Sequence, residues 1–166
     1  MLSHSVTERL INTFVFSRID YCNALLAGVP KTTLNKLQCV QNSAATILTG
    51  ARQNEHITPI LKSLHWLPVR FRVDFKLLML TYKALHGLAL QYLSAFLPVY
   101  TPKRILRSSQ AGLLVVPQTR LRSVGDRAFS SYAPRLWNSL PPHIRDAQNF
   151  ITFKSLLKTH FLWLLF

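Results

Sequence analysis

The sequence predicts a mostly α-helical protein in which a helical half precedes a small α+β half. Apolar residues recur at three- and four-residue steps along most of the chain, and glycines and prolines separate these segments. One β-branched run in the second half is short enough for a strand. Hydrophobic residues make up 49% of the 166 residues, which is enough for a packed core. The composition changes near residues 98–110, so we expect a helical segment, 1–97, and a basic C-terminal segment, 98–166.

Start and stop signals divide the first segment into helices. The first is expected to begin at Ser5 or Thr7, and its apolar face is predicted to comprise Leu10, Ile11, Phe14 and Val15. A second helical piece ends at Gly28 and Pro30. The clearest helix opens at Thr32 or Thr33 and ends at Gly50, with a predicted apolar face of Leu34, Leu37, Val40, Gln41, Ala44 and Leu48.

Further helices complete this segment. Residues 58–65 and 91–97 are expected to form two short helices. Pro68 begins a longer helix that ends at Gly87, because proline fits the first helical turn. Its predicted buried stripe comprises Val69, Val73, Leu77, Leu80 and Ala84.

The basic C-terminal segment is predicted to contain a short hairpin and a terminal helix. Residues 113–116 have the pattern of a strand, and residues 118–122 could pair with it. Asp126 is placed to cap one helix, and Asn149 or Thr152 to cap the last. We expect that last helix to bury Phe153, Leu157 and Phe161, and we expect Trp66 and Trp137 in the core.

Positive charge indicates the class of partner. The chain carries 20 Lys+Arg against 6 Asp+Glu, a formal net charge of +14. Because a globular domain normally mixes its charges, a polyanion is the expected partner, either nucleic acid or an anionic membrane surface. Guanidinium groups bind phosphates and aromatic rings stack on bases, which favours a nucleic-acid backbone with weak sequence preference. The candidate phosphate-binding residues are Arg70, Arg72, Arg104, Arg107, Arg120, Arg122, Arg127 and Arg135.

Four of these arginines are close in sequence, between residues 120 and 135. Arg120 and Arg122 alternate with Leu121, so an extended strand would present both on one side. Arg127 would follow the Asp126 cap, where helix amides also favour anions. The alternative for Arg127 is an ion pair with a carboxylate such as Asp146.

Neither catalysis nor metal binding is expected. The six acids are far apart in sequence and offer no paired carboxylates for two-metal chemistry, and Asp20 is interpreted as an ion-pair partner. The histidines lack metal-ligand spacing, and no glycine-rich phosphate loop occurs. We therefore expect a protein that is not an enzyme and has no cofactor or metal. Cys22 and Cys39 are expected to be buried thiols in a reducing compartment.

Export and membrane-insertion signals are also missing from the sequence. Glu8, Arg9 and Asn12 interrupt the N-terminal segment, and the longest apolar run is the six residues 161–166. A membrane span needs roughly 20 apolar residues. We expect an intracellular protein, in the nucleus or cytoplasm, that is neither secreted nor transmembrane.

Blocks along nearly the whole chain resemble, in order, the C-terminal part of non-LTR (LINE-type, jockey-like) retrotransposon reverse transcriptases. In the first segment they comprise residues 17–23, 25–28, 34–38, 40–42, 56–59, 64–70, 75–76 and 82–87. In the second they comprise 117, 119–120, 125–129, 133–138, 140–141, 153–154 and 157–159. In that family this region follows the polymerase palm, as a helical thumb and its extension.

The resemblance implies a nucleic-acid-handling module without catalysis. The family's aromatic-x-Asp-Asp turn has no counterpart here, because Asp20-Tyr21-Cys22 lacks the second aspartate. The full-length relative copies RNA into DNA at a nicked target, and its palm would be a partner of this region. Two alternatives are an inactive relic that folds poorly without its palm, and a module that binds an anionic membrane or a protein.

Overall fold

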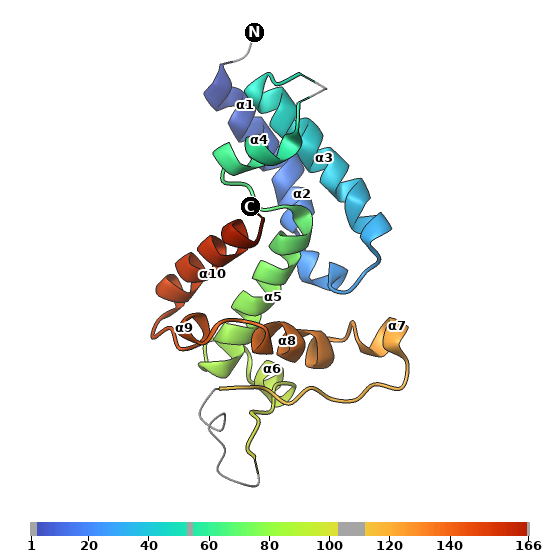
Figure 1. Cartoon of the computed structure of the whole chain (residues 1–166), viewed down its shortest axis with the longest axis vertical. Helices are drawn as coiled ribbons and strands as arrows, with labels where there is room; N and C mark the ends of the chain where they lie inside the picture. The colour runs from blue at the N-terminus through green and yellow to red at the C-terminus, as the bar shows by residue number, and fades with distance from the viewer. Residues whose placement is uncertain (1–2, 53–54, 103–111, 166) are drawn as a thin grey trace. The chain divides into compact units, whose positions relative to one another are not determined.

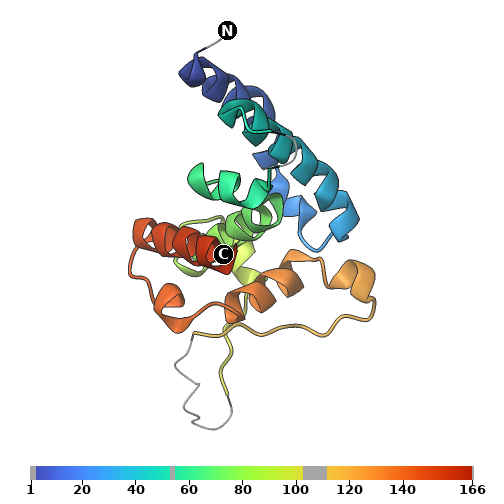
Figure 2. The same ribbon diagram turned by 45° about the horizontal axis from the view of Figure 1, so that its top comes forward.

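The protein is mostly α-helical, as the sequence predicts. The computed structural model describes residues 3–52, 55–102 and 112–165 (Figure 1). Its first helices are α1 (His4–Ile11), the π-helix η1 (Asn12–Phe16), α2 (Ser17–Asp20), the 3₁₀ helix η2 (Asn23–Leu26), α3 (Lys31–Thr49) and α4 (Ile57–Ser63). They are followed by α5 (Val69–Leu85), α6 (Gln91–Ala95), α7 (Arg122–Gly125), α8 (Phe129–Asn138), α9 (Pro142–Arg145) and α10 (Phe150–Leu165) (Figure 2).

The chain divides into two compact units. Unit 1 comprises Met1–Val73 and Phe161–Phe166, and unit 2 comprises Asp74–His160. The boundary that the composition suggested, near residues 98–110, therefore falls inside unit 2. The reason is that the second half of α5 packs with the C-terminal helices: Tyr82 stacks on Phe153, with ring centroids 4.4 Å apart.

The boundaries of helices α1 to α6 agree with the sequence signals to within a few residues. α1 begins after Ser3, whose Oγ accepts a hydrogen bond from the N–H of Val6, so the cap precedes the expected Ser5. Gly50 follows α3 with a φ of 66°, and Gly87 follows α5 with a φ of 69°. Both glycines adopt the left-handed conformation that commonly ends helices, as expected.

A π-helical turn changes which side chains the first helices bury. Ile11 and Phe16 are five residues apart and both are buried. In a regular α-helix they would point about 140° apart, whereas the wider turn of η1 brings residues five apart toward one face. Phe14 is consequently 69% exposed and Leu10 is 41% exposed. Their predicted burial is wrong because the predicted face assumed 3.6 residues per turn.

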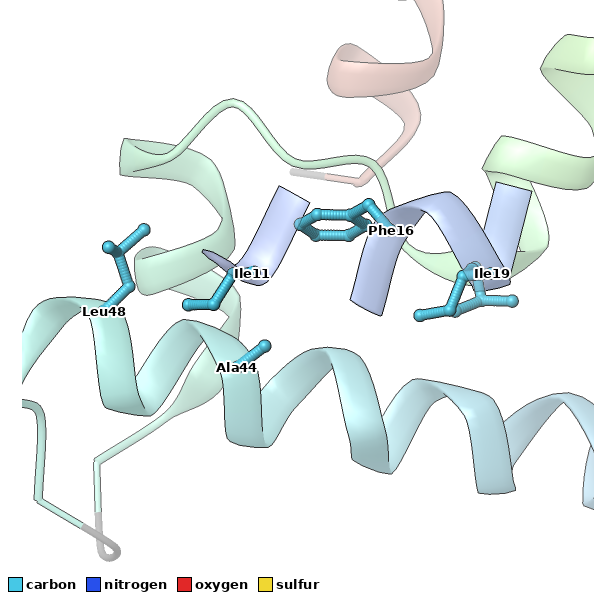
Figure 3. Close-up of a cluster of buried hydrophobic side chains, with 6 residues drawn as sticks. Ile11, Phe16, Ile19, Ala44 and Leu48 are labelled. Carbon is cyan, nitrogen blue, oxygen red and sulfur yellow. The ribbon is translucent and has the colours of Figure 1, made fainter. Parts of the chain in front are cut away.

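The core of unit 1 lies between these first helices and α3. Figure 3 shows Ile11, Phe16 and Ile19 following one another along α3, which contributes Ala44 and Leu48, with Leu48 at the Ile11 end. The ring of Phe16 also meets that of Trp66 edge-on, with centroids 4.5 Å apart. Trp66 is thus packed against this core while remaining partly exposed.

Two glutamines of α3 hold the start of α5. Gln41 is fully buried, and its Nε2 donates to the carbonyl of Leu67 at 2.9 Å. Oε1 of Gln38 accepts from the N–H of Val69, also at 2.9 Å. The first N–H groups of a helix have no intrahelical partner. Gln38 therefore satisfies the N–H of Val69, the first residue of α5.

The core of unit 2 is aromatic. Tyr82, Trp137 and Phe153 are buried, and the rings of Trp137 and Phe153 lie 5.8 Å apart. The hydroxyl of Tyr82 donates to the carbonyl of Ala147 at 3.0 Å, and burial raises the pKa of Tyr82. Phe153, Leu157 and Phe161 are all at most 3% exposed, which confirms the predicted inner face of α10. Its predicted cap is also confirmed, because Asn149 Oδ1 accepts from the N–H of Thr152.

The predicted hairpin of residues 113–116 and 118–122 is wrong. In the described part of the chain, the β-structure is one antiparallel bridge between Val99 and Leu114. In this bridge the N–H of Tyr100 donates to the carbonyl of Leu113 and the N–H of Val115 donates to the carbonyl of Pro98. The N–H and carbonyl of Leu114 itself are both bonded to Asn138, whose Oδ1 accepts at 2.9 Å and whose Nδ2 donates at 2.8 Å. Asn138 therefore occupies the edge at which residues 118–122 were expected to pair, and Arg122 begins α7 instead.

Candidate nucleic-acid interface

Asp126 organises the arginine-rich part of unit 2. Its carboxylate accepts hydrogen bonds from Oγ1 of Thr119 and, at 2.6 Å, from Nη2 of Arg135. We call these three residues the Asp126 cluster. The hydrogen bond from Arg135 to Asp126, and then the charge of that carboxylate, raise the pKa of Arg135 against the opposing effect of burial. The cluster joins the segment before α7, the end of α7 and the middle of α8.

Gly125 permits this close arrangement. A Cβ at this position would lie 2.7 Å from the Cβ of Thr119, which is closer than two non-bonded carbon atoms approach in proteins. The glycine that the sequence places before Asp126 is therefore needed for the contact between α7 and Thr119.

The predicted helix cap at Asp126 is wrong. Asp126 follows the last residue of α7, and α8 begins only at Phe129, after Ala128, without a side-chain cap. The carboxylate is instead engaged by Thr119 and Arg135. Arg127 therefore lies in the turn between α7 and α8 rather than in a first helical turn.

Exposed arginines flank the Asp126 cluster. Arg120 is adjacent to Thr119 and Arg127 is adjacent to Asp126, and both side chains are exposed. Arg135 belongs to the cluster itself. Of the four arginines between residues 120 and 135, Arg135 thus binds the Asp126 carboxylate, while Arg120 and Arg127 are exposed next to cluster residues in the sequence. The extended strand that was expected to align Arg120 with Arg122 is not formed.

The alternative role of Arg127, an ion pair with Asp146, is not observed. Both side chains are exposed, and no ion pair joins them in the part of the chain that the structure describes. Arg127 therefore presents its guanidinium group to solvent.

Arg72 and Arg70 of unit 1 differ in their environment. Arg72 pairs with Asp20 through two hydrogen bonds, of which the one from Nε to Oδ1 measures 2.9 Å. Its guanidinium carbon also lies 4.4 Å from the centroid of the Phe16 ring. This pairing confirms the interpretation of Asp20 as an ion-pair partner and gives Arg72 a role in packing. Arg70 is exposed beside the ring of Phe71.

Two predicted phosphate-binding arginines and three lysines that were not predicted remain to be placed. Arg104 and Arg107 lie outside the described residues. Lys76, Lys154 and Lys158 are exposed on helices of unit 2 and were not among the candidates. The sequence offered one signal for two of them, because Lys154 and Lys158 lie off the apolar face of the last helix.

Basic side chains greatly outnumber acidic ones in unit 2. Residues 74–160 contain twelve lysines and arginines but three acids, Asp74, Asp126 and Asp146. Asp74 is buried and accepts from the hydroxyl of Tyr132 at 3.0 Å, and Asp126 is held in its cluster. Unit 2 is therefore strongly cationic, because three carboxylates cannot neutralise twelve basic side chains.

Three further observations concern metal ligands, the cysteines and membrane-crossing helices. Among the described residues, no three histidine, cysteine, aspartate or glutamate side chains gather as metal ligands would. Cys22 and Cys39 are both exposed, so their predicted burial is wrong. Cys22 lies between α2 and η2 and Cys39 lies on α3, and the apolar periodicity gave no information about a single thiol. Within the described residues, no helix combines the length and apolar character that crossing a bilayer requires.

His160 on α10 should make the stability of the protein sensitive to mild acid. Burial, and then the charge of His143, lower the pKa of His160 from its usual value of 6.5. The unfolded state therefore binds a proton at higher pH than the folded state, and the free energy of unfolding should decrease as the pH falls through about 6.5. Urea denaturation between pH 7.5 and 5 should show this slope, and His160→Gln should reduce it. Lys158→Gln on the same helix is the control, and an unchanged slope in His160→Gln would contradict this assignment.

The fold and the site define a basic, mostly helical protein with an arginine-rich surface on its second unit. No family model, no curated protein and no solved structure matches this chain.

Proposed function

We propose that this chain is a non-catalytic nucleic-acid-binding fragment that binds the phosphate backbone through unit 2. The observation that carries the proposal is the charge of this unit, twelve cationic side chains against three carboxylates, of which two are engaged inside the protein. Charge of this density and sign binds polyanions by releasing their counterions. Arginine predominates among the residues around Asp126, and its planar fork suits phosphate oxygens.

The resemblance to the region after the palm of a LINE-type reverse transcriptase supports the same function. In such an enzyme this region would hold the template–primer backbone beside the catalytic palm. The present chain would keep the backbone-binding surface and lack the catalytic carboxylates. Primer, template, Mg²⁺ and deoxynucleotides should therefore give no extension with this chain.

The salt dependence of binding tests the proposal. A fluorescein-labelled DNA duplex and an RNA duplex of unrelated sequences should bind with similar affinities at low salt. The logarithm of the association constant should fall linearly with the logarithm of salt concentration, with a slope near −0.9 for each phosphate contact on the DNA duplex and about four to eight contacts in all. A flat dependence, or the absence of binding by a protein with a cooperative thermal transition, would reject it.

Replacing Arg120 and Arg127 together by glutamine should locate the interface. Both guanidinium groups are exposed and flank the Asp126 cluster, so their loss should weaken binding about equally for all sequences and reduce the number of phosphate contacts by about two. The control is Arg9→Gln with Arg52→Gln, which removes the same charge from exposed positions of unit 1. Equal losses in the two double variants would mean that the whole charge, rather than this surface, determines binding.

A further inference from the structure

An apolar groove opens on the surface of unit 1. It lies between η1, α2 and η2 on one side and α3 on the other, is open to solvent, and has a volume of about 490 Å³. Its walls are predominantly aliphatic and aromatic. Its lining includes Phe14, Tyr21, Leu25, Leu37, Val40 and Arg18.

The exposure of this groove follows from the local structure of the chain. Phe14 is 69% exposed because the π-helical turn at Asn12–Phe16 assigns Ile11 and Phe16 to the core instead. Tyr21 and Leu25 are each 79% exposed on the opposite wall from Val40 of α3. Contiguous exposed apolar side chains of this size are uncommon on a soluble monomer and commonly mark a binding surface.

The rim of the groove is cationic. Arg18 lines the groove and also the smaller depression beside it, its side chain is exposed, and no ion pair neutralises it among the described residues. The nearest acid in sequence, Asp20, is occupied by Arg72. On α3, Lys36 lies one turn before Val40 and is exposed as well. A ligand of this groove therefore meets apolar walls and positive charge at the edge.

We propose that this groove binds an amphipathic helix of a partner protein, with apolar side chains toward the groove and carboxylates toward Arg18 and Lys36. A helix that presents large apolar residues at i, i+3 or i+4, and i+7 fills a hydrophobic groove of this kind. Acidic residues on its flanks complement the rim and orient the helix. This interaction surface belongs to unit 1 and goes beyond the nucleic-acid binding proposed for unit 2.

Two other occupants fit the groove less well. The rings of Phe14 and Tyr21 suit base stacking, but the aliphatic side chains of Leu25, Leu37 and Val40 offer no partner to the hydrogen-bonding groups at the base edges. A second copy of the chain would bring together two molecules of net charge +14, including two cationic rims.

Synthetic peptides test the proposal directly. The probe is a fluorescein-labelled helical peptide of about 18 residues with leucine on one face and glutamate on its flanks, long enough to form a helix on binding. A matched peptide carries lysine in place of glutamate. Fluorescence anisotropy should show binding of the glutamate peptide in preference to the lysine peptide.

Charge-matched variants assign the binding to the groove. Val40→Asp should weaken binding of the glutamate peptide by about tenfold, as for the loss of a central apolar contact. Leu88→Asp, which adds the same charge at a 60% exposed position of unit 2, should bind almost as the parent does. Arg18→Glu should weaken binding of the glutamate peptide by about threefold and strengthen binding of the lysine peptide. Leu25→Ser gives a second apolar test at a highly exposed position, in case Val40→Asp disturbs α3.

Several results would overturn the proposal. Absence of peptide binding, or equal effects of Val40→Asp and Leu88→Asp, would show that the groove is not the site. Loss of single-stranded RNA binding in Val40→Asp, without peptide binding, would assign the groove to nucleic acid. A concentration-dependent dimer that Val40→Asp abolishes would assign it to a second copy.

Discussion

Replacing Phe153 by alanine should lower the free energy of unfolding by about 3–5 kcal/mol. Phe153 is 0% exposed, and its ring contacts those of Tyr82 and Trp137, at centroid distances of 4.4 and 5.8 Å. Alanine would remove these ring contacts and leave a cavity that the surrounding helices can fill only in part. Urea denaturation followed by far-UV circular dichroism measures the change.

Ile151 provides the matched control for this substitution. It lies two residues earlier on α10 and is 80% exposed, so Ile151→Ala should change the free energy of unfolding by less than about 0.5 kcal/mol. Similar losses for Phe153→Ala and Ile151→Ala would mean that α10 is not docked through its Phe153 face.

Replacing Phe16 by alanine should have an effect of the same size in unit 1, about 3–5 kcal/mol. The buried ring packs with Ile11, Ile19 and the α3 side chains (Figure 3), and it meets the edge of the Trp66 ring. The Arg72 guanidinium also lies over it at 4.4 Å, so the substitution removes a cation–π contact beside the Arg72–Asp20 pair. Chemical denaturation of the whole chain is again the measurement.

Phe14 is the control for Phe16, because it is the same residue type two positions earlier. Its 69% exposure predicts a loss well below 1 kcal/mol in Phe14→Ala, whereas the original helical periodicity predicts the larger loss at this position. The two substitutions therefore distinguish the π-helical turn from a regular α-helix. A larger loss in Phe14→Ala than in Phe16→Ala would show that η1 does not adopt the wider turn.

The charge of the chain and the positions of most of its helices were predictable from local sequence. Gly50 and Gly87 end helices because glycine adopts a positive φ without strain, and this depends little on the rest of the protein. Asn149 caps α10 through its own side chain, and Phe153, Leu157 and Phe161 share one face because they are four residues apart. Each of these features needs information from only a few neighbouring residues.

The environment of the candidate site required contacts between residues that are distant in sequence. The residue type makes Arg72 a candidate phosphate ligand, but its pairing with Asp20 depends on a residue 52 positions away. The local sequence of residues 118–122 does not show that they lack a strand partner. The backbone groups of Leu114 are bonded instead to the side chain of Asn138, which lies 24 residues further along the chain. Asp126 has the residue type and position of a helix cap, but Thr119 and Arg135 engage its carboxylate.

The sequence by itself therefore determined a basic, mostly helical protein, its main helix ends and the inner face of α10. Only the tertiary structure decided which polar side chains stay exposed and which are used inside the protein. The physical reason is that a short segment contains its own backbone preferences and apolar periodicity, whereas a charged side chain is paired or free according to what the folded chain brings beside it. Arg127 and Arg72 have the same side chain, yet Arg127 is exposed, whereas Arg72 pairs with Asp20 and lies against the Phe16 ring because the folded chain brings both beside it.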